Sequence, residues 1–136
     1  MAARIDFINA DLEITSDRPL EPLRDNFMRW GDLFAEMCCE QIGDRYFARF
    51  EIHPEGIDEP SAAQLIHAYC EAIPRLDAEA LALWHGAEKR VIDLGYQGAD
   101  HCPAFHDSLP HPTLLKLSEL EIDLALTFYP ETIENA

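Results

Sequence analysis

The sequence predicts a single α+β domain over residues 1–136, with a mostly antiparallel or mixed sheet and helices packed on one face. Three observations lead to this fold class. Segments that alternate between polar and apolar residues are interleaved with segments of helical spacing, 48% of the residues are hydrophobic, and the length suits one core. The predicted order of elements is β-α-β-β-α-α-β-α-β.

The first half of the chain is expected to contain a strand, a helix and a hairpin, over residues 4–15, 20–30, 33–42 and 45–53. The two hairpin strands are joined by Gly43 and Asp44, a short junction that is typical of a tight turn. Residues 33–42 could instead prolong the helix, because Ala, Glu and Met favour helices. Gly31 separates the two segments and favours the strand.

The second half is expected to contain two helices, a short strand, a further helix and a final strand. Ser61 and Gln64 form a capping-box pattern before the first of these helices, and Asp77 is the expected cap of the second. The short buried strand covers residues 91–94 and stops at Gly95 or Gly98. Residues 97–111 are expected to be irregular, and the last helix and strand cover residues 112–120 and 122–129.

Polar residues on the first and last strands suggest that one face of the sheet meets solvent or a partner. Asp11 and Glu13 alternate with apolar residues in the first strand, and Asp123 does so in the last. An antiparallel sheet with helices on one face leaves such positions on the other.

The chain is strongly acidic, with 26 Asp and Glu residues against 10 Lys and Arg, which gives a formal charge of −16. The acids are spread along the chain. A surface of this kind repels nucleic acid and anionic membranes, and it accelerates encounter with basic proteins. Solubility alone is the other interpretation of the charge. Asp6 interrupts any signal-peptide core and no apolar run approaches a membrane span, so we expect a cytoplasmic protein.

No sequence motif indicates an enzyme. The chain contains no GxSxG, no glycine-rich phosphate loop and no CxxC pair, and its four cysteines do not form a disulfide framework. We therefore predict no catalytic residue, no cofactor and no metal site. One alternative is a metal-dependent enzyme that uses the 101–111 loop, where His101, Cys102, His106 and His111 offer possible zinc ligands. Their spacing matches no standard zinc signature.

The segments NADLEITSD (9–17), ALWHGAEKRVIDLGYQ (82–97) and EIDLALTFYP (121–130) resemble a loose group of small bacterial proteins that has no assigned activity. More broadly, a compact, acidic, motif-free α+β chain is similar to the immunity proteins of bacterial contact-dependent growth inhibition and polymorphic toxin systems. This resemblance implies a cytoplasmic toxin inhibitor that binds a cognate basic, nuclease-type toxin domain. The alternative is a regulatory or structural protein-interaction domain of another pathway.

The residues expected to contact a basic partner lie in two irregular acidic segments. They are Glu55, Asp58 and Glu59 in one segment, and Tyr96, Asp100, Phe105 and Asp107 in the other. Aromatic anchors surrounded by carboxylates suit a tight, electrostatically steered protein interface. A sheet face with Asp11, Glu13 and Asp123 could serve equally well.

Overall fold

The computed structural model describes residues 4–98 and 102–130, which form one α+β domain. In these residues the strands are β1 (Asp6–Ser16), β2 (Phe34–Ile42), β3 (Arg45–Ile52), β4 (Lys89–Gly98) and β5 (Asp123–Pro130). The helices are α1 (Glu21–Met28), α2 (Ala62–Ala72), α3 (Ala78–Gly86) and α4 (His111–Glu119), with short 3₁₀ turns η1 (Gly31–Leu33) and η2 (Ile73–Arg75). The predicted fold class and element order are confirmed.

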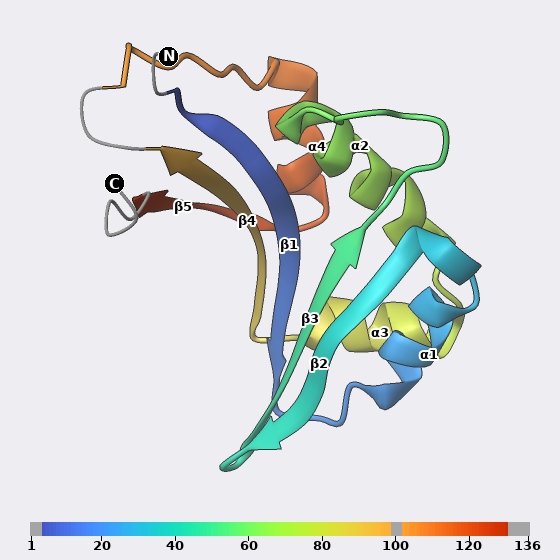
Figure 1. The fold of residues 1–136 in the computed structure, drawn as a ribbon. Helices are drawn as coiled ribbons and strands as arrows, with labels where there is room; N and C mark the ends of the chain where they lie inside the picture. The colour runs from blue at the N-terminus through green and yellow to red at the C-terminus, as the bar shows by residue number, and fades with distance from the viewer. Residues whose placement is uncertain (1–3, 99–101, 131–136) are drawn as a thin grey trace.

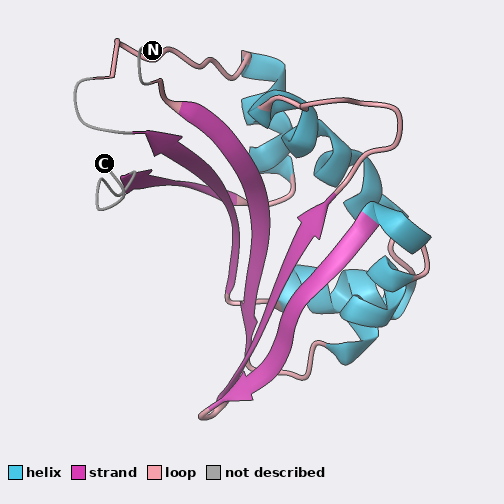
Figure 2. Ribbon diagram, viewed as in Figure 1, coloured by secondary structure: helices cyan, strands magenta, loops and turns pink. Residues whose placement is uncertain are grey.

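The strands form a five-stranded mixed sheet in the order β2-β3-β1-β4-β5 over the described residues. The pairs β2–β3, β3–β1 and β1–β4 are antiparallel, whereas β5 runs parallel to β4. Because parallel neighbours need a crossover connection, the chain passes through α4 between these two strands. In the part of the chain that the structure describes, the four helices lie on one side of the curved sheet and none lies on the other (Figures 1 and 2).

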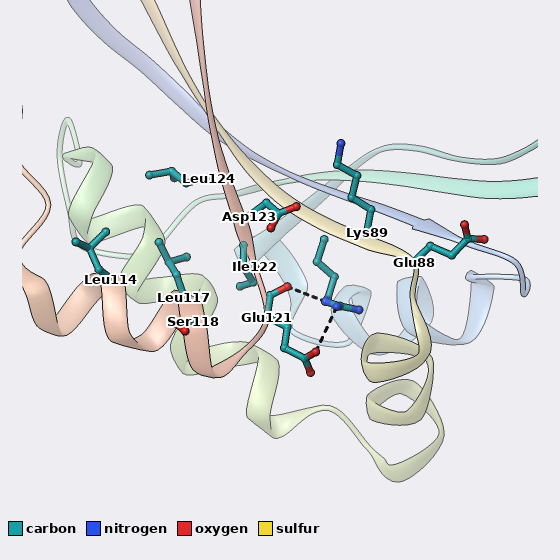
Figure 3. A pocket seen from close by; sticks show the side chains of 10 residues that line it. Glu88, Lys89, Leu114, Leu117, Ser118, Glu121, Ile122, Asp123 and Leu124 are labelled. Atoms are coloured by element: carbon teal, nitrogen blue, oxygen red, sulfur yellow. Dashed lines mark hydrogen bonds and ion pairs between the residues drawn. The ribbon is translucent and has the colours of Figure 1, made fainter.

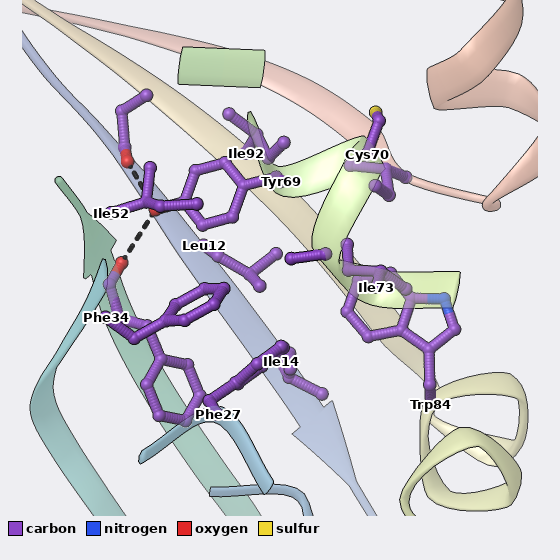
Figure 4. Packing of buried hydrophobic residues seen from close by; sticks show 14 of the residues in the cluster. Leu12, Ile14, Phe27, Phe34, Ile52, Tyr69, Cys70, Ile73, Trp84 and Ile92 are labelled. Atoms are coloured by element: carbon purple, nitrogen blue, oxygen red, sulfur yellow. Dashed lines mark hydrogen bonds between the residues drawn. The ribbon is translucent and has the colours of Figure 1, made fainter. Parts of the chain in front are cut away.

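The core lies between the sheet and the helices (Figure 4). Leu12 and Ile14 project from β1 into this layer and are fully buried. Phe27 of α1 stacks on Phe34 with ring centroids 4.2 Å apart and meets the edge of Phe50 at 5.0 Å. Burial of these aromatic and aliphatic side chains removes apolar surface from water, which is the main favourable contribution to folding.

The predicted helix caps are present. The backbone N–H of Gln64 donates to the Ser61 hydroxyl at 3.2 Å, and the Ser61 N–H donates to the Gln64 side chain at 2.9 Å. The Ala80 N–H donates to the Asp77 carboxylate at 2.9 Å. Asn26 of α1 also exchanges two hydrogen bonds with Asp77, of 2.8 and 3.0 Å. The cap of α3 therefore also ties α1 to α3.

The 33–42 segment forms strand β2 from Phe34 onward, as predicted, with Leu33 in η1. The β2–β3 turn places Gly43 at φ +62°, in the left-handed region that glycine tolerates best. Strand β4 begins at Lys89, before the predicted start at residue 91, and ends at Gly98, the later of the two predicted ends. A side chain at Gly95 would put its Cβ 2.5 Å from the side-chain amide oxygen of Asn9, so this glycine leaves room for the Asn9 side chain on the neighbouring strand β1. The interpretation of Gly95 as a possible strand end is therefore wrong, as is the assignment of Tyr96 to an irregular segment.

Candidate protein-binding surface

The helix-free side of the sheet, called the open face below, carries a cluster of charged residues from its central strands. Side chains alternate between the two faces of a strand, and the residues between the buried core positions point to the open face. Four of these are carboxylates, called the acidic cluster below: Asp11, Glu13, Glu51 and Asp93. The register pairs Asp11 with Asp93 and Glu13 with Arg49 across neighbouring strands.

Two members of the acidic cluster have good partners. A guanidinium nitrogen of Arg49 lies 2.9 Å from a carboxylate oxygen of Glu13. The Thr127 hydroxyl of β5 lies 2.8 and 2.9 Å from the two oxygens of Asp93, so it shares its hydrogen between them. These contacts fix the orientation of both carboxylates on the open face.

Asp11 and its neighbour Arg49 are the exceptions within the described residues. The Oδ1 atom of Asp11 and the Nε atom of Arg49 are both buried and have no hydrogen-bond partner. Asp11 also faces Asp93 directly across the β1–β4 ladder, and like charges at such positions destabilise a sheet. A buried acceptor without a donor costs free energy, so this atom marks where an added donor would be most favourable.

The surroundings of Asp11 raise its pKa to about 6. The largest cause is burial, which disfavours the charged carboxylate, and the next is repulsion by Glu51. Arg49 lowers the pKa, whereas Glu13 and Asp93 raise it further. Strongly shifted pKa values are concentrated at functional sites, and Asp11 lies at the centre of the acidic cluster.

The predicted contact residues Glu55, Asp58 and Glu59 are exposed on the loop between β3 and α2. This loop borders a groove that opens where β3 separates from β1, lined in part by Ile8, Asn9, Glu51 and Ile57. Below the groove, the buried Tyr69 hydroxyl lies 2.7 Å from the Ala10 carbonyl and 3.1 Å from that of Phe50. The loop therefore adjoins the open face at Glu51.

Three residues of the second predicted segment come together. Phe105 meets Tyr96 edge-on at 5.4 Å, and the Tyr96 hydroxyl donates to the Asp107 carboxylate at 2.9 Å. Tyr96 is nevertheless a buried β4 residue, and burial followed by the bond to Asp107 raises its pKa to about 12. It holds the 102–110 segment on the sheet and is not an exposed anchor, which corrects its predicted role. Phe105 remains exposed, and Asp100 lies outside the described residues.

The alternative of a metal-dependent enzyme depends on His101, Cys102, His106 and His111. No group of three His, Cys, Asp or Glu side chains within residues 4–98 and 102–130 could hold a metal ion, and His101 falls outside this part of the chain. Burial raises the pKa of the Cys39 and Cys70 thiols to about 11. Thiols in this state are poor nucleophiles at neutral pH.

A groove between α4 and the start of β5 contains the buried charge of Arg90 (Figure 3). Its guanidinium donates to the carbonyls of Trp84, Ala87 and Glu121 at 2.8 to 3.0 Å. Trp84 itself is fully buried, and its indole N–H donates to the Leu120 carbonyl. Arg90 therefore joins the end of α3 to the turn before β5, and three of its five N–H donors are used by these backbone carbonyls.

Sequence analysis missed Arg49, Glu51 and Asp93 as members of the open face. The sequence of β3 does contain a signal, because the apolar residues Ala48, Phe50 and Ile52 alternate with Arg49 and Glu51. Asp93 interrupts the apolar run of β4 in the same way. Their proximity to Asp11 depends on the order and register of the strands, which alternation does not specify.

Comparison with known proteins found no matching family model, no matching curated protein and no matching solved structure. None of the helices in the described part of the chain has the length and hydrophobicity that a bilayer span needs.

Proposed function

We propose that this protein is an acidic protein-binding module whose open face binds a basic protein partner. More specifically, we propose that this protein is an immunity protein that neutralises a basic, nuclease-type toxin domain. It has no catalytic activity of its own. The observation that carries the proposal is the buried Asp11 oxygen without a donor, at the centre of the acidic cluster.

A lysine or arginine of a partner that binds over the acidic cluster would add a positive charge near Asp11. This charge would offset the repulsion from Glu51 and Asp93. Nuclease domains suit this role because they hold phosphates with basic side chains. The formal charge of −16 would also steer such a partner toward the protein before contact.

The experiment compares two triple variants that remove the same charge. The open-face variant carries Asp11→Asn, Glu51→Gln and Asp93→Asn, and the loop variant carries Glu55→Gln, Asp58→Asn and Glu59→Gln. The partner captured from the source cell with the wild-type chain is purified, and its association and dissociation rates are measured from 0.05 to 0.5 M salt. Candidate toxin domains encoded beside the gene are tested in the same assay.

We expect the open-face variant to slow association and weaken binding by at least about tenfold, and the loop variant to do so less. The wild-type association rate should fall steeply with salt while dissociation changes little. If the loop variant weakens binding more than the open-face variant does, the partner binds at the segment with Glu55, Asp58 and Glu59 and not at the open face. An acidic partner, or an association rate that is indifferent to salt, would refute the proposal.

A further inference from the structure

The two edges of the sheet differ in how they are protected from pairing with another strand. Natural edge strands avoid such pairing with charges, bulges and short length. At the β2 edge, the ladder with β3 contains a bulge between Glu36 and Cys38, and Glu36 and Glu40 add charge. The β2 edge therefore carries two of the usual protective features.

The β5 edge has weaker protection. Its register with β4 runs without a bulge from Asp123 to Pro130, and the one charge in this range, Asp123, and the proline lie at its two ends. Within the described residues β5 pairs on one side, with β4, so alternate backbone N–H and C=O groups point outward. Leu126 is 68% exposed, Phe128 51% and Tyr129 50%. This is a long, regular and apolar edge.

We propose that a second copy of this chain pairs with β5 in antiparallel orientation, with Leu126 opposite Leu126 at a two-fold axis. Directly opposed residues must lie on the same face of the combined sheet. In this register Leu124 of each copy faces Phe128 of the other, on the helix side. The result is an unbroken apolar ladder across the interface.

A second copy fits this edge because β5 is complementary to itself. The same register places Asp123 opposite Tyr129 of the other copy, so the charged residues of the two strands are not opposed. An isologous contact also closes after two copies, whereas pairing of β5 with β2 of another copy would continue into a filament. The bulge and acids of β2 oppose that open-ended assembly.

The surroundings of the edge extend the apolar surface on the helix side. Ile5, Tyr96 and Phe105 line a shallow groove together with Leu126 and Phe128. In the paired assembly this groove would lie beside the central ladder and add apolar contact to the backbone hydrogen bonds. The charge of −16 on each copy opposes association, so salt should strengthen the dimer. This is the reverse of the salt dependence expected for a basic partner.

The test is analytical ultracentrifugation of the purified full chain from micromolar to near-millimolar concentration, at 0.15 and 0.5 M NaCl. We expect a reversible species of twice the 15.5 kDa chain mass, with a lower Kd at 0.5 M. Leu126→Asp and Leu126→Lys should each raise the Kd at least about tenfold, because like charges then meet at the axis. An equimolar mixture of the two variants should restore the dimer, because residue 126 then faces its opposite charge.

Met37→Asp on the exposed β2 edge is the matched control and should leave the Kd unchanged. Thermal melts check that each variant is folded. Because Leu126 and Met37 are exposed, we expect these substitutions to leave the fold intact. A wild-type chain that stays monomeric throughout would overturn the proposal, as would a dimer unaffected at residue 126 or a mixture that fails to associate. If the wild type is monomeric and Leu126→Asp instead weakens binding of the basic partner, the edge receives a strand of that partner and the dimer is wrong.

Discussion

The polar side chains on the two sides of the sheet differ in whether they have hydrogen-bond partners. On the helix-covered face, Tyr69 lies within hydrogen-bond distance of two strand carbonyls and the side chains of Asn26 and Asp77 bond to each other. On the open face, Asp11 has a buried oxygen without a donor among the described residues and faces Asp93. The covered face is organised for folding, whereas the open face keeps an unfavourable arrangement that contact with a cation would relieve.

The largest expected effect comes from removing a satisfied polar group on the covered face. Tyr69→Phe deletes the hydroxyl that lies between the carbonyls of Ala10 and Phe50, and leaves these acceptors buried. We expect the free energy of unfolding to fall by about 2 kcal/mol, measured by urea denaturation. The exposed Tyr129→Phe is the control and should change stability by less than about 0.5 kcal/mol. Equal effects of the two changes would contradict the comparison.

On the open face, we expect removal of a charged group to raise the free energy of unfolding. Asp11→Asn removes a carboxylate that burial and its acidic neighbours disfavour, and should stabilise the protein by about 1 kcal/mol at pH 8, after allowance for solvent screening. Urea denaturation at pH 8 measures the gain. Asp58→Asn, on the exposed loop, is the matched control and should have little effect. A loss of stability in Asp11→Asn would show that this carboxylate is favourably placed.

The gain from Asp11→Asn should depend on pH. Folded Asp11 keeps its proton up to about pH 6, whereas the unfolded chain releases it near the ordinary value of 3.8. Between these values the folded state binds more protons, so the favourable contribution of Asp11 is complete below about pH 4 and is lost as the pH rises through 6. The variant and the wild type should therefore converge in stability at pH 4.

The smallest expected effect is that of salt on the free protein. The Debye length falls from about 30 Å at 0.01 M to about 10 Å at 0.1 M, which screens repulsion among the spread carboxylates. We expect the melting temperature to rise by a few degrees over this range, measured by calorimetry. The open-face triple variant should gain less than the wild type. A flat or falling melting temperature would mean that local ion pairs such as Arg49–Glu13 outweigh the general repulsion.

Most elements could be predicted because their signals are local. Alternation located β1 and β3, and the Ser61–Gln64 and Asp77 caps located the starts of α2 and α3. The end of β4 was left open between Gly95 and Gly98 because a glycine can break a strand. The strand ends at Gly98, and Gly95 leaves room for the side chain of Asn9. Tyr96 was misassigned for the same reason. The final strand was found, but its alternation gave no sign that Leu126 and Phe128 lie beyond the cover of the helices.

The amino-acid sequence by itself determined the α+β class, the order of the elements and the acidic character of the surface. These properties depend on residue type and on the spacing of apolar residues within about ten positions, because side-chain direction repeats with a fixed period along a helix or strand. Tertiary structure alone decided that Asp11 meets Asp93 and lies near Glu51, and that β5 and β2 are the opposite edges of the sheet in the described residues, with β5 the less protected of the two. The physical reason is that strand order and register arise from the packing of distant segments around one core, and no local pattern encodes them.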